Sequence, residues 1–177
     1  MLFRSSLPVE ITLRTTADGP RLFVNPVREL EALRARSHEI PAQPLRTGEN
    51  PLGEVAGELL EVVADLAVGS TEKITLTMRG ITVVYDGKKR ELTCQNRTIP
   101  LSPVDGRIRL RAYLDRTLLT LFANDGQAYL PMAVSPAKGS LGLSLAAVGD
   151  GAEIRSLQVH ELSSIWKNKK QGVTPSP

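Results

Sequence analysis

Aromatic residues and cysteine are scarce in this sequence, and neither sign of charge dominates it. Its 177 residues include one Trp, three Tyr, three Phe and one Cys, and the formal net charge is +3. Nucleic-acid binders cluster basic residues and interleave aromatic side chains among them. Here Lys and Arg are spread along the chain, so nucleic acid is not an expected partner. The single Cys94 can form neither an intramolecular disulfide nor a thiolate metal site, and is expected to be buried.

Several other signals are missing. No apolar run approaches the length of a transmembrane helix, so a membrane is not an expected partner. The first 13 residues lack the sustained apolar core of a signal peptide. His38 and His160 lie far apart in the sequence without ligand-spaced neighbours, so neither a metal nor a cofactor is expected. No glycine-rich phosphate loop and no Ser-His-Asp set can be argued.

The stretch 107–132 carries the clearest structural pattern. Its first half alternates apolar and polar residues with a period of two: Ile108, Leu110, Ala112 and Leu114 against Arg107, Arg109, Arg111 and Tyr113. This pattern predicts a half-buried antiparallel strand. Residues 118–122 form an apolar run that predicts a strand buried on both faces, and Asn124-Asp125-Gly126 predicts a turn. A sheet of this kind needs a second layer over its apolar face, which favours a β-sandwich.

The rest of the chain fits the same class. Residues 9–15 and 21–24 predict an N-terminal hairpin. Residues 25–34 predict a short helix, with Asn25 as its N-cap and Pro26 in its first turn. From residue 38 onward, short strands separated by Asp-Gly and Gly-Asp turns predict an antiparallel sandwich or barrel. Residues 57–68 could be helical by propensity, but the Val pair and the flanking glycines favour a long strand.

The expected organisation is all-β, a two-sheet antiparallel sandwich of the jelly-roll or concanavalin type with one short N-terminal linker helix. Residues 1–24 form the hairpin, 25–37 the linker helix, 38–166 the sandwich and 167–177 a flexible tail. Phe23 and Phe122 are expected in the core. Trp166 is expected to anchor the end of the last strand.

Three segments together resemble one known family. Residues 26–34 (PVRELEALR) resemble the linker helix after the catalytic domain in glycoside hydrolase family 32, the levanases, inulinases and invertases. Residues 110–126 (LRAYLDRTLLTLFANDG) resemble that family's sandwich motif, and residues 153–166 resemble its usual ending. The family often has a Glu where this chain has Thr120. The order and spacing of the segments also agree.

The resemblance implies a C-terminal accessory module without its catalytic partner. In such enzymes a five-bladed β-propeller carries two catalytic carboxylates, one of which is the nucleophile and the other the acid/base. Their Trp-Met-Asn-Asp-Pro-Asn, Arg-Asp-Pro and Glu-Cys motifs are absent from this sequence. No catalytic residue is therefore expected, and the hairpin would match the last propeller strands. The resemblance also implies extracellular or periplasmic localisation.

Candidate binding residues lie on the polar side of the central stretch. Sugar-binding modules commonly present exposed aromatic rings, for which Tyr85, Tyr113 and Tyr129 are the candidates. Tyr113 shares a face with the arginines and is expected to be exposed. The candidate carbohydrate-binding set is Tyr113, Arg109, Arg111 and Asp115. The alternative interpretation is a solvated strand face, with an ion pair between Asp115 and Arg116 at a strand corner.

Three functions follow from these observations. The leading hypothesis is a non-catalytic module that stabilises a fructan-hydrolysing propeller, in cis or in trans, and aids substrate binding. The second is a free-standing module that binds fructan oligosaccharides or another glycan. The third is a homo-oligomeric structural domain that pairs through the open edge of its hairpin.

Overall fold

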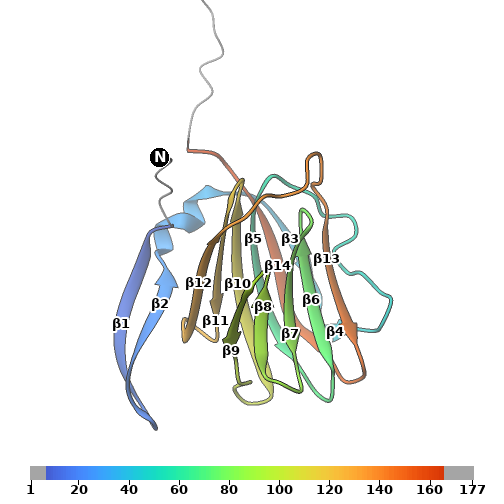
Figure 1. The fold of residues 1–177 in the computed structure, drawn as a ribbon. Helices are drawn as coiled ribbons and strands as arrows, with labels where there is room; N and C mark the ends of the chain where they lie inside the picture. The colour runs from blue at the N-terminus through green and yellow to red at the C-terminus, as the bar shows by residue number, and fades with distance from the viewer. Residues whose placement is uncertain (1–6, 166–177) are drawn as a thin grey trace, which may run out of the picture.

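The computed structural model describes residues 7–165, which fold into two stacked sheets and a separate hairpin (Figure 1). The elements are β1 (Val9–Thr16), β2 (Gly19–Pro26), the 3-10 helix η1 (Arg28–Leu33), β3 (Arg34–Ile40), β4 (Gln43–Pro44), β5 (Leu59–Ala67), β6 (Lys73–Met78), β7 (Ile81–Asp86), β8 (Glu91–Cys94), β9 (Arg97–Pro100), β10 (Arg107–Asp115), β11 (Leu118–Ala123), β12 (Ala128–Ala133), β13 (Leu143–Val148) and β14 (Glu153–Leu162). The predicted all-β sandwich is confirmed, and residues 57–68 contain a strand, as predicted.

The larger sheet has the order β12-β11-β10-β5-β14-β3, with the short β4 also paired to β14. The smaller sheet has the order β13-β6-β7-β8-β9. The last strand, β14, lies between β5 and β3, so the end of the chain joins the linker region to the middle of the sheet. The central stretch forms β10, β11 and β12 as neighbours, as predicted.

The core lies between the two sheets and follows the alternation seen in the sequence. The inner face of the larger sheet contributes Leu60, Val62, Ala64 and Leu66 from β5 and Ile108, Leu110, Ala112 and Leu114 from β10. β11 is buried at five of its six positions, which confirms the strand buried on both faces. Cys94 is buried on β8, as expected.

A second, smaller cluster covers the outer face of the larger sheet. Leu30 of η1 packs with Tyr113 and Phe122, and Val9 and Val24 of the hairpin pack against this group. The two hairpin strands pair with each other as a separate sheet, beside β11 and β12 (Figure 1). Phe122 is therefore buried as expected, but beneath the hairpin and linker and not between the sheets.

The turn after β11 joins the hairpin to the sandwich. Asn124, Asp125 and Gly126 have positive φ values of 47°, 57° and 92°, which confirms the predicted turn. The Val24 N–H donates to the carbonyl oxygen of Gly126 at 2.9 Å. A Cβ on Gly126 would lie 2.5 Å from the Val24 carbonyl oxygen. Only glycine allows the two backbones to approach this closely.

The prediction of a linker helix over residues 25–34 was wrong in extent and type. β2 continues to Pro26, which pairs with Val9, and the helical segment is a 3-10 helix that starts at Arg28. Asn25 does not cap it, because its side-chain amide donates to the Asp125 carbonyl oxygen at 3.1 Å. Sheet pairing and contact with the turn thus override the local capping signal.

The boundary of the sandwich also differs from the prediction. Residues 34–40 form β3 and pair with β14, so the larger sheet begins at Arg34 and not at residue 38. The linker is therefore a single short 3-10 segment between two strands. Trp166 and the tail 167–177, for which an anchor and a flexible segment were predicted, lie outside the described residues.

Candidate functional site

A buried carboxylate lies on the outer face of the larger sheet. The side chain of Glu61, on β5, is fully buried. Arg34 donates to both carboxylate oxygens, at 2.7 and 2.9 Å. The Nε of Arg111 and the hydroxyl of Tyr113 each donate to Oε1 at 2.7 Å. Burial favours the protonated acid, but the hydrogen bonds from Arg34, Tyr113 and Arg111 outweigh it and lower the pKa of Glu61 to about 2.

Strand register brings these groups together. Tyr113 lies directly across from Glu61, and Arg111 is two residues along β10 on the same face. Arg34 follows the last residue of η1, and Glu31 of η1 lies 3.3 Å from Arg111 and 3.7 Å from Arg34. Two carboxylates and two guanidinium groups thus form a charge-balanced ion cluster that ties η1 to the sheet. Because Glu61 accepts four hydrogen bonds, it is a structural group and not a general base.

The expectation that Tyr113 presents an exposed ring was wrong. The residue is 2% exposed, and its ring packs edge-on against Phe122 with centroids 6.2 Å apart. Helix η1 and the hairpin cover this part of the polar face. Burial, followed by the hydrogen bond to Glu61, raises the pKa of Tyr113, so its hydroxyl stays a donor. Tyr113 serves the ion cluster and offers no stacking surface.

The other aromatic candidates also lack a freely exposed ring. Tyr85 is 1% exposed, on the inner face of β7, and Tyr129 is half-buried beside Phe122.

Thr120 lies opposite Tyr113 on β11, where the family often has Glu. Its buried hydroxyl has no hydrogen-bond partner within residues 7–165. No polar contact made by Thr120 therefore takes part in the ion cluster.

The arginine stripe on β10 is paired with acidic residues of β5 and of the turn. Arg107 lies 3.2 Å from Asp65, and Arg109 lies 3.5 Å from Asp65 and 2.7 Å from Asp125. Sequence reasoning missed Glu61 and Asp65. The signal was available, because these two residues are four apart on one face of a strand antiparallel to the arginines.

The predicted ion pair between Asp115 and Arg116 was wrong. Arg116 occupies the turn between β10 and β11 with a φ of 45°, and its Nε lies 3.7 Å from Glu58. Asp115 is exposed at the end of β10. The guanidinium of Arg116 instead pairs with Glu58, which precedes β5, the strand next to β10. Within the described range, no ion pair involves Asp115.

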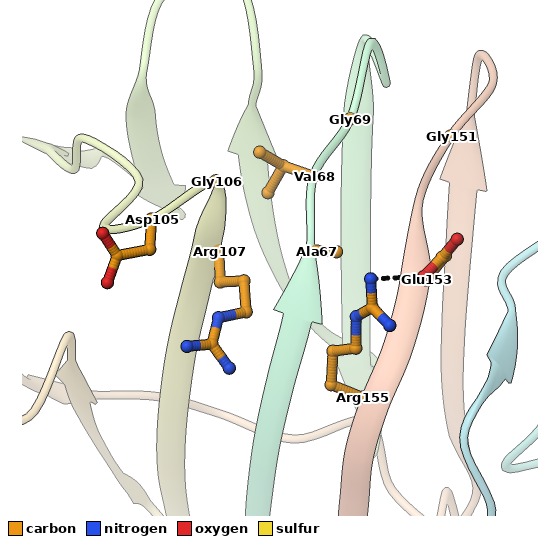
Figure 2. Close-up of a pocket in the computed structure, with 9 residues that line it drawn as sticks. All are labelled: Ala67, Val68, Gly69, Asp105, Gly106, Arg107, Gly151, Glu153 and Arg155. Atoms are coloured by element: carbon orange, nitrogen blue, oxygen red, sulfur yellow. Dashed lines mark ion pairs between the residues drawn. The ribbon is translucent and has the colours of Figure 1, made fainter.

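The four predicted binding residues divide between two hollows. Arg109 and Arg111 line a hollow of about 280 Å³ with polar and apolar walls, together with Asp65 and Ser156. Tyr113 and Asp115 line a mostly apolar hollow of about 250 Å³ between η1 and the sheet. A third hollow, of about 610 Å³, lies at the end of β5 and contains none of the four (Figure 2). The predicted carbohydrate site is thus not a single cavity.

The two histidines, distant in sequence, lie on neighbouring strands. His38 Nε2 is 2.9 Å from Glu161, and His160 Nδ1 is 2.7 Å from the hydroxyl of Ser37. Burial and then the nearby Arg34 lower the pKa of His160.

Over residues 7–165 no three His, Cys, Asp or Glu side chains gather as a metal-binding group. The same range contains no helix long and apolar enough to cross a membrane.

The hairpin carries an apolar surface open to solvent. Ile11, Leu13 and Leu22 are 60%, 69% and 62% exposed, and Leu13 pairs directly with Leu22. Because residues two apart in a strand share a face, Ile11 lies on the same side as Leu13. These three residues are called the hairpin apolar face below. Such a patch is typical of a surface that another protein or domain covers.

Two stacked antiparallel sheets, with a separate two-stranded hairpin at the outer face of the larger one, define the chain as a β-sandwich protein. The model of the family described as glycosyl hydrolases family 32 C terminal matches residues 29–161. The chain belongs to this family.

Similar proteins cover most of this chain but extend well beyond it. A levanase of Bacillus subtilis is 28% identical over 97% of the chain, and a levanase of Bacillus sp. strain L7 is 27% identical over 92%. The matches span 28% and 20% of those two enzymes. Among solved structures, an exo-inulinase of Aspergillus awamori has a TM-score of 0.73 at 16% identity, over 91% of this chain and 36% of its own. A fructofuranosidase of Schwanniomyces occidentalis has a TM-score of 0.71 at 14% identity, over 90% and 40%.

Proposed function

We propose that the chain is the non-catalytic accessory sandwich of a fructan-hydrolysing enzyme and that it stabilises a catalytic β-propeller. The hairpin apolar face carries this proposal. Of the six large apolar side chains exposed within residues 7–165, three lie together on the hairpin. Burying each of them stabilises a complex by up to about 1.5–3 kcal/mol. The levanases to which the chain is similar are several times longer, so they have room for the propeller.

The ion cluster supports the same function. A hairpin on a loose linker would hold a propeller at no defined angle. Here Glu61 binds Arg34 directly after η1, and the hairpin hydrogen-bonds to the turn at Gly126. Both attachments orient the hairpin apolar face relative to the sheets. The expected location is extracellular or periplasmic, where polymeric fructan is present.

The test uses the propeller encoded beside this chain, in the same polypeptide or in a neighbouring reading frame. Purified wild-type chain should bind that propeller and raise its melting temperature and its stability in a levan or inulin hydrolysis assay. Leu13→Asp should weaken this association at least about tenfold, because it places a charge in the apolar contact. Leu141→Asp is the matched control, since Leu141 is also exposed but precedes β13 on the other sheet.

Two results would refute the proposal. The flanking coding sequence could lack any propeller, or Leu13→Asp and Leu141→Asp could bind the propeller equally well. The chain alone is expected to hydrolyse neither fructan. Hydrolysis by the pure chain would also contradict a non-catalytic role.

Self-association is a second candidate, favoured by one observation. Within the described residues β1 pairs with β2 alone, so its outer edge has free backbone donors and acceptors next to the hairpin apolar face. Light scattering distinguishes the two candidates. A stable dimer that Leu13→Asp dissociates would support self-association, and a wild-type monomer at high concentration would remove it.

A further inference from the structure

The third hollow contains none of the four predicted binding residues, although Arg107 of the arginine stripe lines it. It is about 610 Å³ and opens at the end of β5, on the outer face of the larger sheet. Figure 2 shows Arg107 of β10 and Arg155 of β14 on the two sides of Ala67. Turns containing Gly69, Gly106 and Gly151 form its rim.

The rim depends on close backbone packing. A Cβ on Gly69 would lie 2.3 Å from the Gly151 carbonyl oxygen, so these two turns can approach only without a side chain. The floor of the hollow is also small, because its side chain is the methyl group of Ala67. Ala67 pairs with Arg107 on one side and Glu153 on the other. Ala67 therefore leaves open space between the long polar side chains of Arg107 and Arg155.

A local irregularity in β14 positions one of these side chains. The pairing between β14 and β5 shifts register between Ile154 and Ser156, so that Arg155 is an extra residue. Such a bulge redirects a side chain, and bulges are frequent beside functional sites. Arg155 consequently lines the hollow together with Glu153.

The charges in the hollow are paired and balanced. Arg155 lies 2.8 Å from Glu153, and Arg107 lies 3.2 Å from Asp65. The lining residues include two acids, Asp105 and Glu153, and two arginines. A balanced site does not favour an anion over a neutral ligand. A guanidinium group has five N–H donors, so each arginine keeps donors beyond its ion pair.

We propose that this hollow binds a neutral oligosaccharide, with one sugar ring over Ala67. Hydroxyl oxygens of the sugar accept from Arg107 and Arg155, and a hydroxyl donates to Glu153. The identity of the sugar as fructan rests on the proposed function. The adjoining hollow offers the polar side chains of Asp65 and Arg109 to further rings. Because the lining contains no aromatic ring, affinity should be weak, with a Kd of about 1 mM.

The experiment titrates the ¹⁵N-labelled full chain with levan and inulin oligosaccharides and follows amide shifts by NMR. The largest shifts should map to Gly69, Gly106 and Gly151. Arg155→Ala should raise the Kd at least about fivefold, the effect of losing one hydrogen bond. Ala67→Ile should abolish binding by filling the floor. Arg36→Ala is the matched control, an exposed, ion-paired arginine on β3, and should leave the Kd unchanged.

Several outcomes would overturn the site. These are no shifts at 10-fold above the expected Kd of about 1 mM, shifts that map elsewhere, or an unchanged Kd in both variants. Tighter binding of an acidic peptide or polygalacturonate than of the neutral oligosaccharides would also overturn it. No propeller takes part, so failure here is distinct from failure of the Leu13→Asp test. Malto-oligosaccharide binding with no fructan binding would retain the hollow but refute its fructan specificity.

Discussion

Glu61 is the residue on which attachment of the linker depends most. Its pKa is lowered from 4.5 to about 2 in the folded protein. The Glu61 carboxylate therefore takes up a proton at higher pH in the unfolded chain than in the folded chain. The stabilisation is complete above pH 4.5 and is lost as the pH falls from 4.5 toward 2. In total it amounts to about 3 kcal/mol, of which about 2 kcal/mol is gone by pH 3.

This acid sensitivity is tested with Glu61→Gln. Urea unfolding between pH 6 and pH 3 should show a drop in the free energy of unfolding that is about 2 kcal/mol larger in wild type than in the variant. Glu54→Gln is the control for the substitution itself, because Glu54 is exposed and lies outside the ion cluster. Equal acid slopes for wild type and Glu61→Gln would contradict the assigned role of the ion cluster.

The hydroxyl of Tyr113 makes a smaller, separable contribution. Tyr113→Phe keeps the ring packed against Phe122 but removes a 2.7 Å hydrogen bond to the carboxylate. The expected loss is about 1.5 kcal/mol in the free energy of unfolding, as for hydrogen bonds to charged groups. Denaturant unfolding at pH 7 measures it, with Tyr129→Phe as a half-buried comparison that should change little. Oligosaccharide titration should be unaffected by Tyr113→Phe, since the ring is not a binding platform.

At the scale of elements, the turn at Gly126 should control docking of the hairpin. Gly126→Ala places a Cβ 2.5 Å from the Val24 carbonyl oxygen, at a φ of 92°. Gly106→Ala has a similar φ of 72° but meets nothing within 4 Å, so it measures backbone strain alone. The free energy of unfolding of each variant should fall by about 1 kcal/mol or more because of backbone strain. Only Gly126→Ala should also speed amide hydrogen exchange in β2, and equal exchange in both variants would refute docking through this turn.

Sequence alternation correctly predicted the strands and turns whose local pattern agrees with their packing in the folded protein. β10, β11 and the Asn124-Asp125-Gly126 turn follow from local patterns, because burial and turn geometry there agree with tertiary structure. The linker helix failed for the opposite reason. The predicted hairpin continues to the pairing of Pro26 with Val9, and the Asn25 side chain is bound by Asp125, 100 residues away, which no helix signal could reveal.

The prediction that Tyr113 is exposed was wrong for a related reason. A period of two assigns it to the outer face of the sheet but does not indicate what covers that face. Leu30 of η1 and the hairpin provide the cover. Likewise, the hollow at Arg155 depends on a bulge that the alternation of β14 does not reveal. The sequence thus predicted which face of the sheet each residue lies on, but not which segments cover the outer face.

At the scale of the whole molecule, the hairpin and linker form a layer held to the sandwich by few contacts. The core between the sheets does not include Leu30 or Tyr113, which belong to the outer cluster, and Glu61 belongs to the ion cluster beside it. Regions with few buried contacts open with smaller free energies than the core does. The hairpin should therefore open before the sheets do, and the ion cluster should set how often this happens.

Arg34→Ala tests this separation of layers. It removes two hydrogen bonds from Glu61 but leaves Arg111 and Tyr113 bound to the carboxylate, so the sandwich should stay folded. Amide exchange in η1, β1 and β2 should rise about tenfold, which corresponds to about 1.4 kcal/mol, while exchange in β5 and β10 stays near wild type. Arg36→Ala, on the same strand but with its side chain 71% exposed, should change neither region. A uniform rise across hairpin and sheets would mean that the chain opens as one unit. The ion cluster would then stabilise the fold without orienting the hairpin, and the hairpin apolar face would approach a propeller without a defined angle.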